Sequence, residues 1–143
     1  MRLLPLAVLA ILVSLVVAAP ASAAFSFKAF HTPSGNITCV ASGDRATGKD
    51  FALRCDIRSH TWRAPKQTRP CDAGDYGSSL GLTKRGRAKF ICVSDAPPPS
   101  KKLAYGKLWK FGPFSCRVRT SGLRCHNVAK HGWFLSMASY KRF

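Results

Sequence analysis

Apolar and polar residues alternate in two segments, residues 37–41 and 51–57, and each segment contains one cysteine. If Cys39 lies opposite Cys55 in an antiparallel strand pair, the apolar side chains share one face, because strand side chains alternate with a period of two residues. A shift of one residue would mix the two faces. The pattern therefore predicts a hairpin closed by a Cys39–Cys55 disulfide. Its apolar face would hold Ile37 opposite Ile57 and Ala41 opposite Leu53, and its polar face would hold Thr38, Arg54 and Asp56.

The same reasoning predicts a second hairpin near the end of the chain. Placing Cys116 opposite Cys125 brings Val118 opposite Leu123. The four-residue loop between these strands ends in Gly122, at a position where hairpin turns often require a positive φ. Because the cysteine register and the turn chemistry agree, we expect a Cys116–Cys125 disulfide.

This second register places two arginines directly opposite each other on the outer face of the hairpin. Arg117 faces Arg124, and Arg119 lies close by in the turn. Like charges opposed across a strand pair are destabilising, and an anion bridging the two guanidinium groups would relieve the repulsion. The alternative is that the long side chains splay apart in solvent at little cost. The predicted anion-binding residues are Arg117, Arg119 and Arg124 on this hairpin and Lys84, Arg85 and Arg87 in a separate basic turn.

The remaining segments predict further short strands. Residues 80–83 and 88–93 would form a hairpin with the basic turn at its tip, and residues 88–93 have the composition of a central strand. A Cys71–Cys92 bridge then follows by elimination. Shorter strands are expected within residues 24–33 and 107–111, a buried strand or turn at residues 133–135, and a helical turn after Ser136. We therefore expect a mainly β fold: a small disulfide-stapled domain of antiparallel hairpins with a short C-terminal helical turn.

The N-terminus has the pattern of a secretory signal peptide. A basic start is followed by an apolar run from Leu3 to Ala19 and by a small-x-small sequence ending at Ala23, which predicts cleavage after Ala23. Removal of 23 of the 143 residues leaves 120, enough for one domain over residues 24–143. We expect the proline-rich stretch at 97–99 to be a surface loop within that domain.

Cysteine content and charge indicate an exported protein with anionic partners. All six cysteines follow the predicted signal peptide, and an even number in an exported chain is typical of a disulfide framework. Lysine and arginine number 23 against 6 acids, all of them aspartates, and removal of Arg2 leaves 22 − 6 = +16. Such a surplus favours anionic partners such as cell-wall polymers, phospholipid headgroups or nucleic acid, although general basicity of exported proteins is an alternative explanation.

Few residues are candidates for catalysis or metal binding. His126 and His131 could act as acid and base in phosphodiester cleavage, but structural roles for histidine are more common. No serine-nucleophile motif or paired carboxylate accompanies them. Asp72 and Asp75 do not match a calcium-loop spacing, so neither a metal nor a cofactor is predicted.

The motifs of the chain together resemble those of a known family. The sequence is similar to small exported bacterial proteins of actinobacterial type that share a six-cysteine domain of unknown function. Tyr76 and Lys130 depart from the usual tryptophan and glycine. The resemblance implies an exported disulfide-bonded domain and transfers no catalytic residue. The residues that carry it are Ser34-Gly35-Asn36-Ile37 with Cys39, Arg54-Cys55-Asp56-Ile57, Cys71-Asp72 with Tyr76-Gly77, Phe90 with Cys92 and Asp95, Leu103 with Tyr105-Gly106, Gly112-Pro113-Phe114 with Cys116, Gly122 with Cys125 and Asn127, and 131–136 with Tyr140 and Phe143.

The functional expectation is a secreted or cell-wall-associated, non-catalytic binding module with a basic, anion-attracting surface. The first alternative is a small secreted ribonuclease-like hydrolase that uses His126 or His131. The second is a cationic membrane-active protein, which the sequence supports least because it contains no clear amphipathic helix.

Overall fold

The computed structural model describes residues 24–72 and 74–143, so the predicted signal peptide (residues 1–23) lies outside the described residues. The fold is mainly β, as the sequence predicted. In the part of the chain that the structure describes there is no helix, and therefore none long and apolar enough to cross a membrane. The strands are β1 (Phe25–His31), β2 (Ile37–Asp44), β3 (Lys49–Ile57), β4 (Ser79–Thr83), β5 (Lys89–Phe90), β6 (Lys101–Lys102), β7 (Leu108–Phe111), β8 (Phe114–Arg119), β9 (Gly122–His126), β10 (Gly132–Leu135) and β11 (Tyr140–Arg142).

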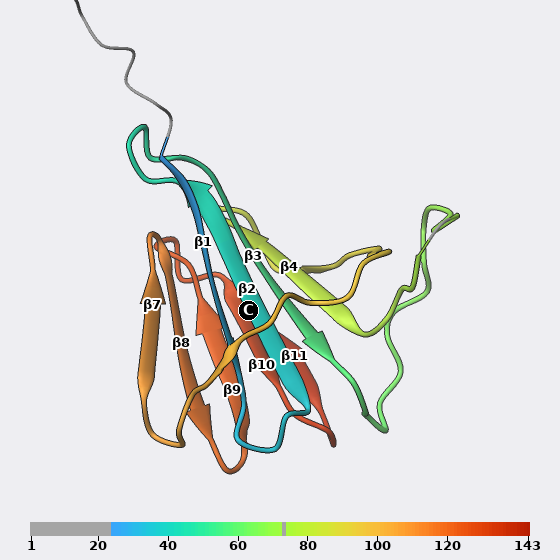
Figure 1. Cartoon of the computed structure of the whole chain (residues 1–143). Helices are drawn as coiled ribbons and strands as arrows, with labels where there is room; N and C mark the ends of the chain where they lie inside the picture. Colours follow the sequence, from blue (N-terminus) through green and yellow to red (C-terminus); the bar gives the residue numbers. More distant parts are fainter. Residues whose placement is uncertain (1–23, 73) are drawn as a thin grey trace, which may run out of the picture.

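The strands form two sheets that face each other (Figure 1). The first sheet has the order β5-β4-β3-β2-β1-β6, and the second has the order β11-β10-β9-β8-β7. Neighbouring strands are antiparallel except for β1 and β6, which pair in parallel over two residues. Aromatic contacts join the two sheets at both edges, with Phe30 against Trp109 at one edge and Phe90 against Tyr140 at the other.

Both predicted hairpin registers are confirmed. In β2 and β3, Cys39 lies opposite Cys55 and the apolar pairs lie opposite each other as expected. In β8 and β9, Cys116 lies opposite Cys125. The loop of the second hairpin is shorter than predicted, because Arg119 pairs with Gly122, whose φ of 146° favours glycine. All three predicted disulfides are present, including Cys71–Cys92.

The core lies between the sheets and contains two of the disulfides at its centre. Cys39, Cys55, Cys116 and Cys125 are each fully buried, and the sulfur atoms of Cys39, Cys55 and Cys125 lie within 4.8 Å of one another. These sulfurs are oxidised, so their closeness reflects packing of cystines and not a metal site. The alternation in each hairpin places its buried face against the other hairpin, which is why both disulfides meet in the core.

Two segments differ from the prediction. The strand expected over residues 88–93 has only two residues, β5, and lies at the sheet edge, because Cys92 leaves the sheet to bond Cys71 and Val93 pairs instead with Asp75. The helical turn expected after Ser136 is absent, and its last residues form β11. The hydroxyl of Ser136 accepts a hydrogen bond from the N–H of Ser139 and closes a tight turn that returns the chain to β10.

Candidate anion-binding face

The outer face of the second sheet carries a row of residues that crosses all five strands. Residues paired directly across antiparallel strands point to the same face, and neighbouring strands lie ~4.8 Å apart, so the row is about 19 Å long. It is exposed or partly exposed throughout, whereas the opposite face of β7 to β10 is buried. In strand order the row reads Leu108, Arg117, Arg124, Phe134 and Lys141.

The centre of this row borders a hollow of about 450 Å³. The three arginines predicted from the second hairpin, Arg117, Arg119 and Arg124, all line it, together with His126 and Phe134. Arg117 and Arg124 are directly opposed, as predicted from the register. No carboxylate lines the hollow among the described residues, so the arginine charges there are not neutralised by the protein.

Neutral contacts hold two of these arginines in place. The guanidinium of Arg117 donates a hydrogen bond of 2.8 Å to the carbonyl oxygen of Gly106. The guanidinium carbon of Arg124 lies 4.0 Å from the centre of the Phe143 ring, a cation–π contact. These contacts position each side chain while leaving its charge available, which is the arrangement that favours recognition of an external anion.

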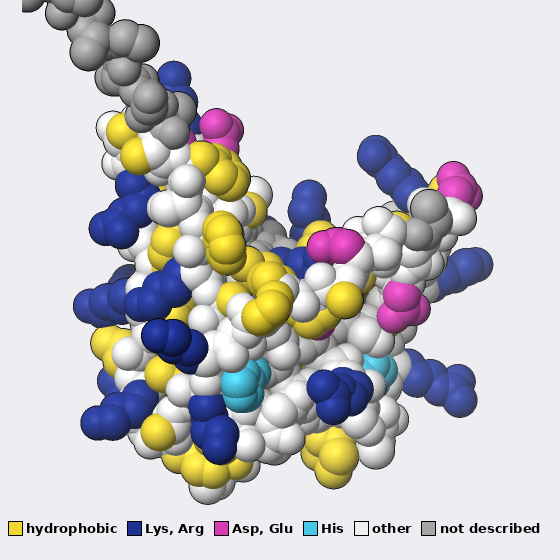
Figure 2. Space-filling view, in the orientation of Figure 1, with side chains coloured by type: hydrophobic (Ala, Val, Ile, Leu, Met, Phe, Trp, Pro, Cys, Tyr) yellow, Lys and Arg dark blue, Asp and Glu magenta, His cyan; other side chains and the backbone are white. Residues whose placement is uncertain are grey.

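The acids of the protein lie elsewhere. All six aspartates fall between residues 44 and 95, in the first sheet or its loops. Asp44 is occupied in the turn after β2, where hydrogen bonds from the side chain and backbone of Thr47 hold its pKa below the usual value. Figure 2 shows Asp side chains in the upper and right-hand parts of the view, whereas the charged side chains at the lower left are Lys and Arg. The ten cations after residue 95 are Lys101, Lys102, Lys107, Lys110, Arg117, Arg119, Arg124, Lys130, Lys141 and Arg142.

His126 is the titratable group of the arginine hollow. Partial burial lowers its pKa from the usual value, and the positive charges of Lys130 and Arg124 lower it further. The imidazole is therefore more often neutral near pH 7 than an exposed histidine would be. An anion bound in the hollow would oppose these effects, because negative charge favours the imidazolium form.

The predicted basic turn lies at another place and is held there by Asn127. The amide of Asn127, which is 1% exposed, donates to the carbonyl oxygens of Thr83 at 2.9 Å and Gly86 at 2.8 Å. These bonds hold residues 84–87 against the turn between β9 and β10. Arg87 lines a separate hollow of about 670 Å³ with Lys141 and Arg142. The six predicted cations therefore form two groups, three arginines at the hollow of the second hairpin and three cations in the basic turn. Lys141 lies between them, because it belongs to the row and also lines the hollow of Arg87.

His131 does not share the hollow of His126. Its Nδ1 lies 3.1 Å from the carbonyl oxygen of Arg85, which places His131 among the contacts that hold the basic turn. The two histidines therefore occupy different settings, although they are only five residues apart in the sequence.

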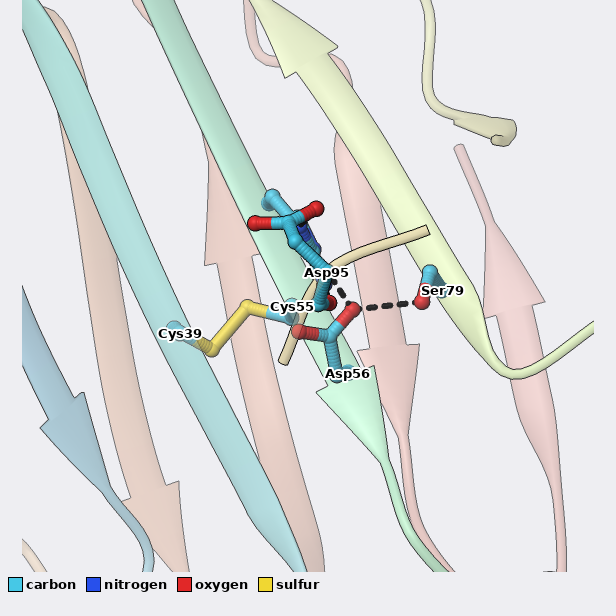
Figure 3. Close-up of polar contacts among 6 residues, drawn as sticks. Cys39, Cys55, Asp56, Ser79 and Asp95 are labelled. Carbon is cyan, nitrogen blue, oxygen red and sulfur yellow. Dashed lines mark hydrogen bonds and ion pairs between the residues drawn. A yellow bond between two sulfur atoms is a disulfide. The ribbon is translucent and has the colours of Figure 1, made fainter. Parts of the chain in front are cut away.

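A further polar cluster was not predicted as a site. On the outer face of the first sheet, Nε of Arg54 contacts Asp56 at 2.8 Å, and its terminal nitrogens contact the side chain of Asp95 at 2.8 Å and the Asp95 carbonyl oxygen at 2.7 Å. The hydroxyl of Ser79 donates to Asp56 (Figure 3). Hydrogen bonding from Arg54 lowers the pKa of Asp95. The cluster ties the proline-rich loop to β3, and the placement of Arg54 and Asp56 on one face was its only signal in the sequence.

Comparison with known proteins identifies a family but no characterised relative. Residues 7–143 match the model of a family of unknown function, DUF6636. No curated protein and no solved structure matches the chain.

Proposed function

The chain belongs to the DUF6636 family of unknown function, and we propose that it is a binding module for anionic polymers whose interface is the outer face of the second sheet. The observation that supports this most strongly is the Arg117–Arg124 pair. Two opposed cations destabilise a strand pair, and no carboxylate among the residues lining the hollow compensates them. Guanidinium groups suit the oxygens of phosphates or carboxylates, which follow one another along a polyanion chain.

The row on this face favours a linear ligand. Arg117, Arg124 and Lys141 lie along one line across the sheet, and Lys141 also borders the neighbouring hollow, which Arg87 lines. A polymer that crosses the strands along this row would meet the cations of β8, β9 and β11 in turn. Three disulfides in a small domain are consistent with an extracellular protein, so we propose that the ligand is an extracellular or cell-wall polyanion.

The binding function can be tested by the salt dependence of affinity for a phosphodiester polymer such as single-stranded DNA. Each phosphate contact contributes about 0.7–0.9 to the slope of log affinity against log salt. Combining Arg117→Ala with Arg124→Ala should therefore weaken binding and reduce the slope by about 1.5. The matched control is Arg63→Ala with Arg69→Ala, which removes two exposed arginines from a different part of the surface. Equal losses in both double variants would show that only net charge matters and would reject the proposed interface.

The geometry of the hollow supports binding more than hydrolysis. Phosphodiester cleavage by acid–base catalysis usually requires two titratable groups near the reacting phosphate, and His126 is the only histidine, with no carboxylate, among the described residues that line the hollow. Incubation of the oxidised protein with RNA should therefore leave the RNA intact. Cleavage that disappears in His126→Ala would instead support the hydrolase.

A further inference from the structure

A second site lies at the edge of the sandwich, where β1 and β6 lie beside β7 (Figure 1). It is a groove of about 710 Å³, a volume in the range of small-molecule sites. Leu108 is the only lining residue that this groove has in common with the arginine hollow, and the arginines of that hollow do not line the groove. The groove thus borders the proposed polyanion interface but has a lining of its own.

One wall of the groove is fixed by contacts to β1. The segment from Pro99 to Leu103 pairs with β1 through β6. The N–H of Leu103 donates to the carbonyl oxygen of His31 at 2.9 Å, and Nδ1 of His31 lies 2.9 Å from the hydroxyl oxygen of Ser100. The wall is therefore held in place by the protein itself, so little ordering would be required when a ligand enters.

The floor of the groove is apolar and contains an unpaired donor. Trp109 and Phe30 are 5% and 2% exposed, and their ring centres lie 4.8 Å apart. Leu103 and Leu108 extend the apolar surface, and Leu108 remains 46% exposed. The indole N–H of Trp109 is buried and has no hydrogen-bond partner within the described residues. A buried donor of this kind is costly to leave unpaired.

The rim is cationic. Four lysines line the groove, and no aspartate does so among the described residues. The ammonium nitrogen of Lys28 lies 5.6 Å from the centre of a Trp109 ring, so one cation stands directly over the floor. Lysine stems cover apolar surface while their ammonium groups stay in water. The lysines are Lys28, Lys101, Lys102 and Lys110.

We propose that this groove binds a single-chain lipid with an anionic head, such as a fatty carboxylate. The alkyl chain lies on Leu108 and Leu103, beside the largely buried rings of Trp109 and Phe30, and the carboxylate lies among the lysines of the rim. This occupant follows from charge complementarity together with the apolar floor. A polyanion without an apolar part would leave the exposed side chain of Leu108 in water, and a neutral lipid would make no use of the four lysines.

Titration with octanoate, decanoate and dodecanoate below their micellar concentrations tests the proposal. Each added pair of methylenes should raise affinity about tenfold. The indole N–H signal of Trp109, assigned with Trp109→Phe, should shift on binding. An affinity independent of chain length, or binding that leaves this signal unmoved, would overturn the proposal.

Two comparisons test the lysine rim. Lys101→Ala with Lys102→Ala should weaken decanoate binding by roughly fivefold. The matched control, Lys66→Ala with Lys89→Ala, lies outside the groove and should bind decanoate as the wild type does. Decanol that binds as tightly as decanoate, or equal losses in both double variants, would refute a headgroup site. Near-ultraviolet circular dichroism of each variant verifies that the fold is retained.

Discussion

His126 shows how one residue can couple the proposed binding site to pH. Burial first, and then the charges of Lys130 and Arg124, lower its pKa in the free protein. A bound polyanion would raise this pKa again, since negative charge stabilises the imidazolium. The bound state would therefore take up protons as pH falls, and by linkage the affinity should increase.

The expected result is stronger polyanion binding when the pH falls from about 8 to about 5, the range in which histidine titrates. His126→Gln should flatten that dependence, and His131→Gln, outside the hollow, serves as the control. The measurement is affinity against pH at constant ionic strength. An unchanged pH profile in His126→Gln would remove this residue from the site.

The lowered pKa of His126 has the opposite effect on the stability of the free protein, which should decrease as pH falls. Because the folded-state pKa of His126 is depressed, the unfolded chain binds more protons between that pKa and the ordinary value of about 6.5. The contribution of His126 to folding stability is therefore fully present above its pKa in the unfolded chain, and it is lost as pH falls toward its lower pKa in the folded protein.

At the scale of elements, Asn127 joins the turn between β9 and β10 to the basic turn of the first sheet. Asn127 donates to Thr83 and Gly86 and accepts from the N–H groups of Ala129 and His131. It therefore closes its own turn and holds the basic turn of the first sheet. This single buried amide connects hairpins that are more than forty residues apart in the sequence.

Asn127→Ala should lower the free energy of unfolding by about 3 kcal/mol, because it leaves buried carbonyl and N–H groups without partners. Urea unfolding with the disulfides intact measures the change. Asn36→Ala is the matched control, since Asn36 exchanges two hydrogen bonds with the backbone of Ser59 at an exposed site. We expect a loss of about 1 kcal/mol there. Similar losses in the two variants would contradict a special role for the buried amide.

At the scale of the whole molecule, the two sheets differ in where acidic side chains stand beside the cations. The first sheet and its loops hold every aspartate, and the second presents cations on its outer face. The Arg54–Asp56–Asp95 cluster satisfies charge within the protein, whereas the arginine hollow leaves it unsatisfied. This difference separates a structural ion-pair cluster from a candidate interface.

The disulfides also have different roles in the whole molecule. Cys116–Cys125 is fully buried between the sheets, whereas at the margin Cys71 is half-buried and Cys92 is exposed. In the chain-entropy model both contribute about 3 kcal/mol. Replacing Cys116 and Cys125 by alanine also removes core volume and should cost more, about 4–5 kcal/mol in total.

Denaturant unfolding of the two double-alanine variants would rank these contributions. A larger loss of unfolding free energy from Cys71→Ala with Cys92→Ala would contradict the prediction that the buried disulfide contributes more to stability. A transition that is no longer two-state in either variant would show that the corresponding disulfide is required for cooperative folding.

The sequence by itself determined both hairpin registers and the Arg117–Arg124 opposition. These features are local: the alternation of side chains, the cysteine positions and the turn residues all act within a few residues of one another. The period-two pattern states which side chains share a face of a strand. The pattern does not state which strand lies beside a given strand, or for how many residues the two strands pair. For this reason the strand that corresponds to β5 was predicted too long.

Only the tertiary structure decided which distant segments meet. Arg54 and Asp95 are 41 residues apart, and the groove at the sheet edge combines Lys28 from β1 with Trp109 from β7. The order of strands within each sheet, and the packing of one sheet on the other, depend on the fit of buried side chains over the whole core. The sequence therefore predicted a stapled hairpin with two opposed arginines, and the tertiary structure placed that pair at the centre of the exposed outer face of the second sheet.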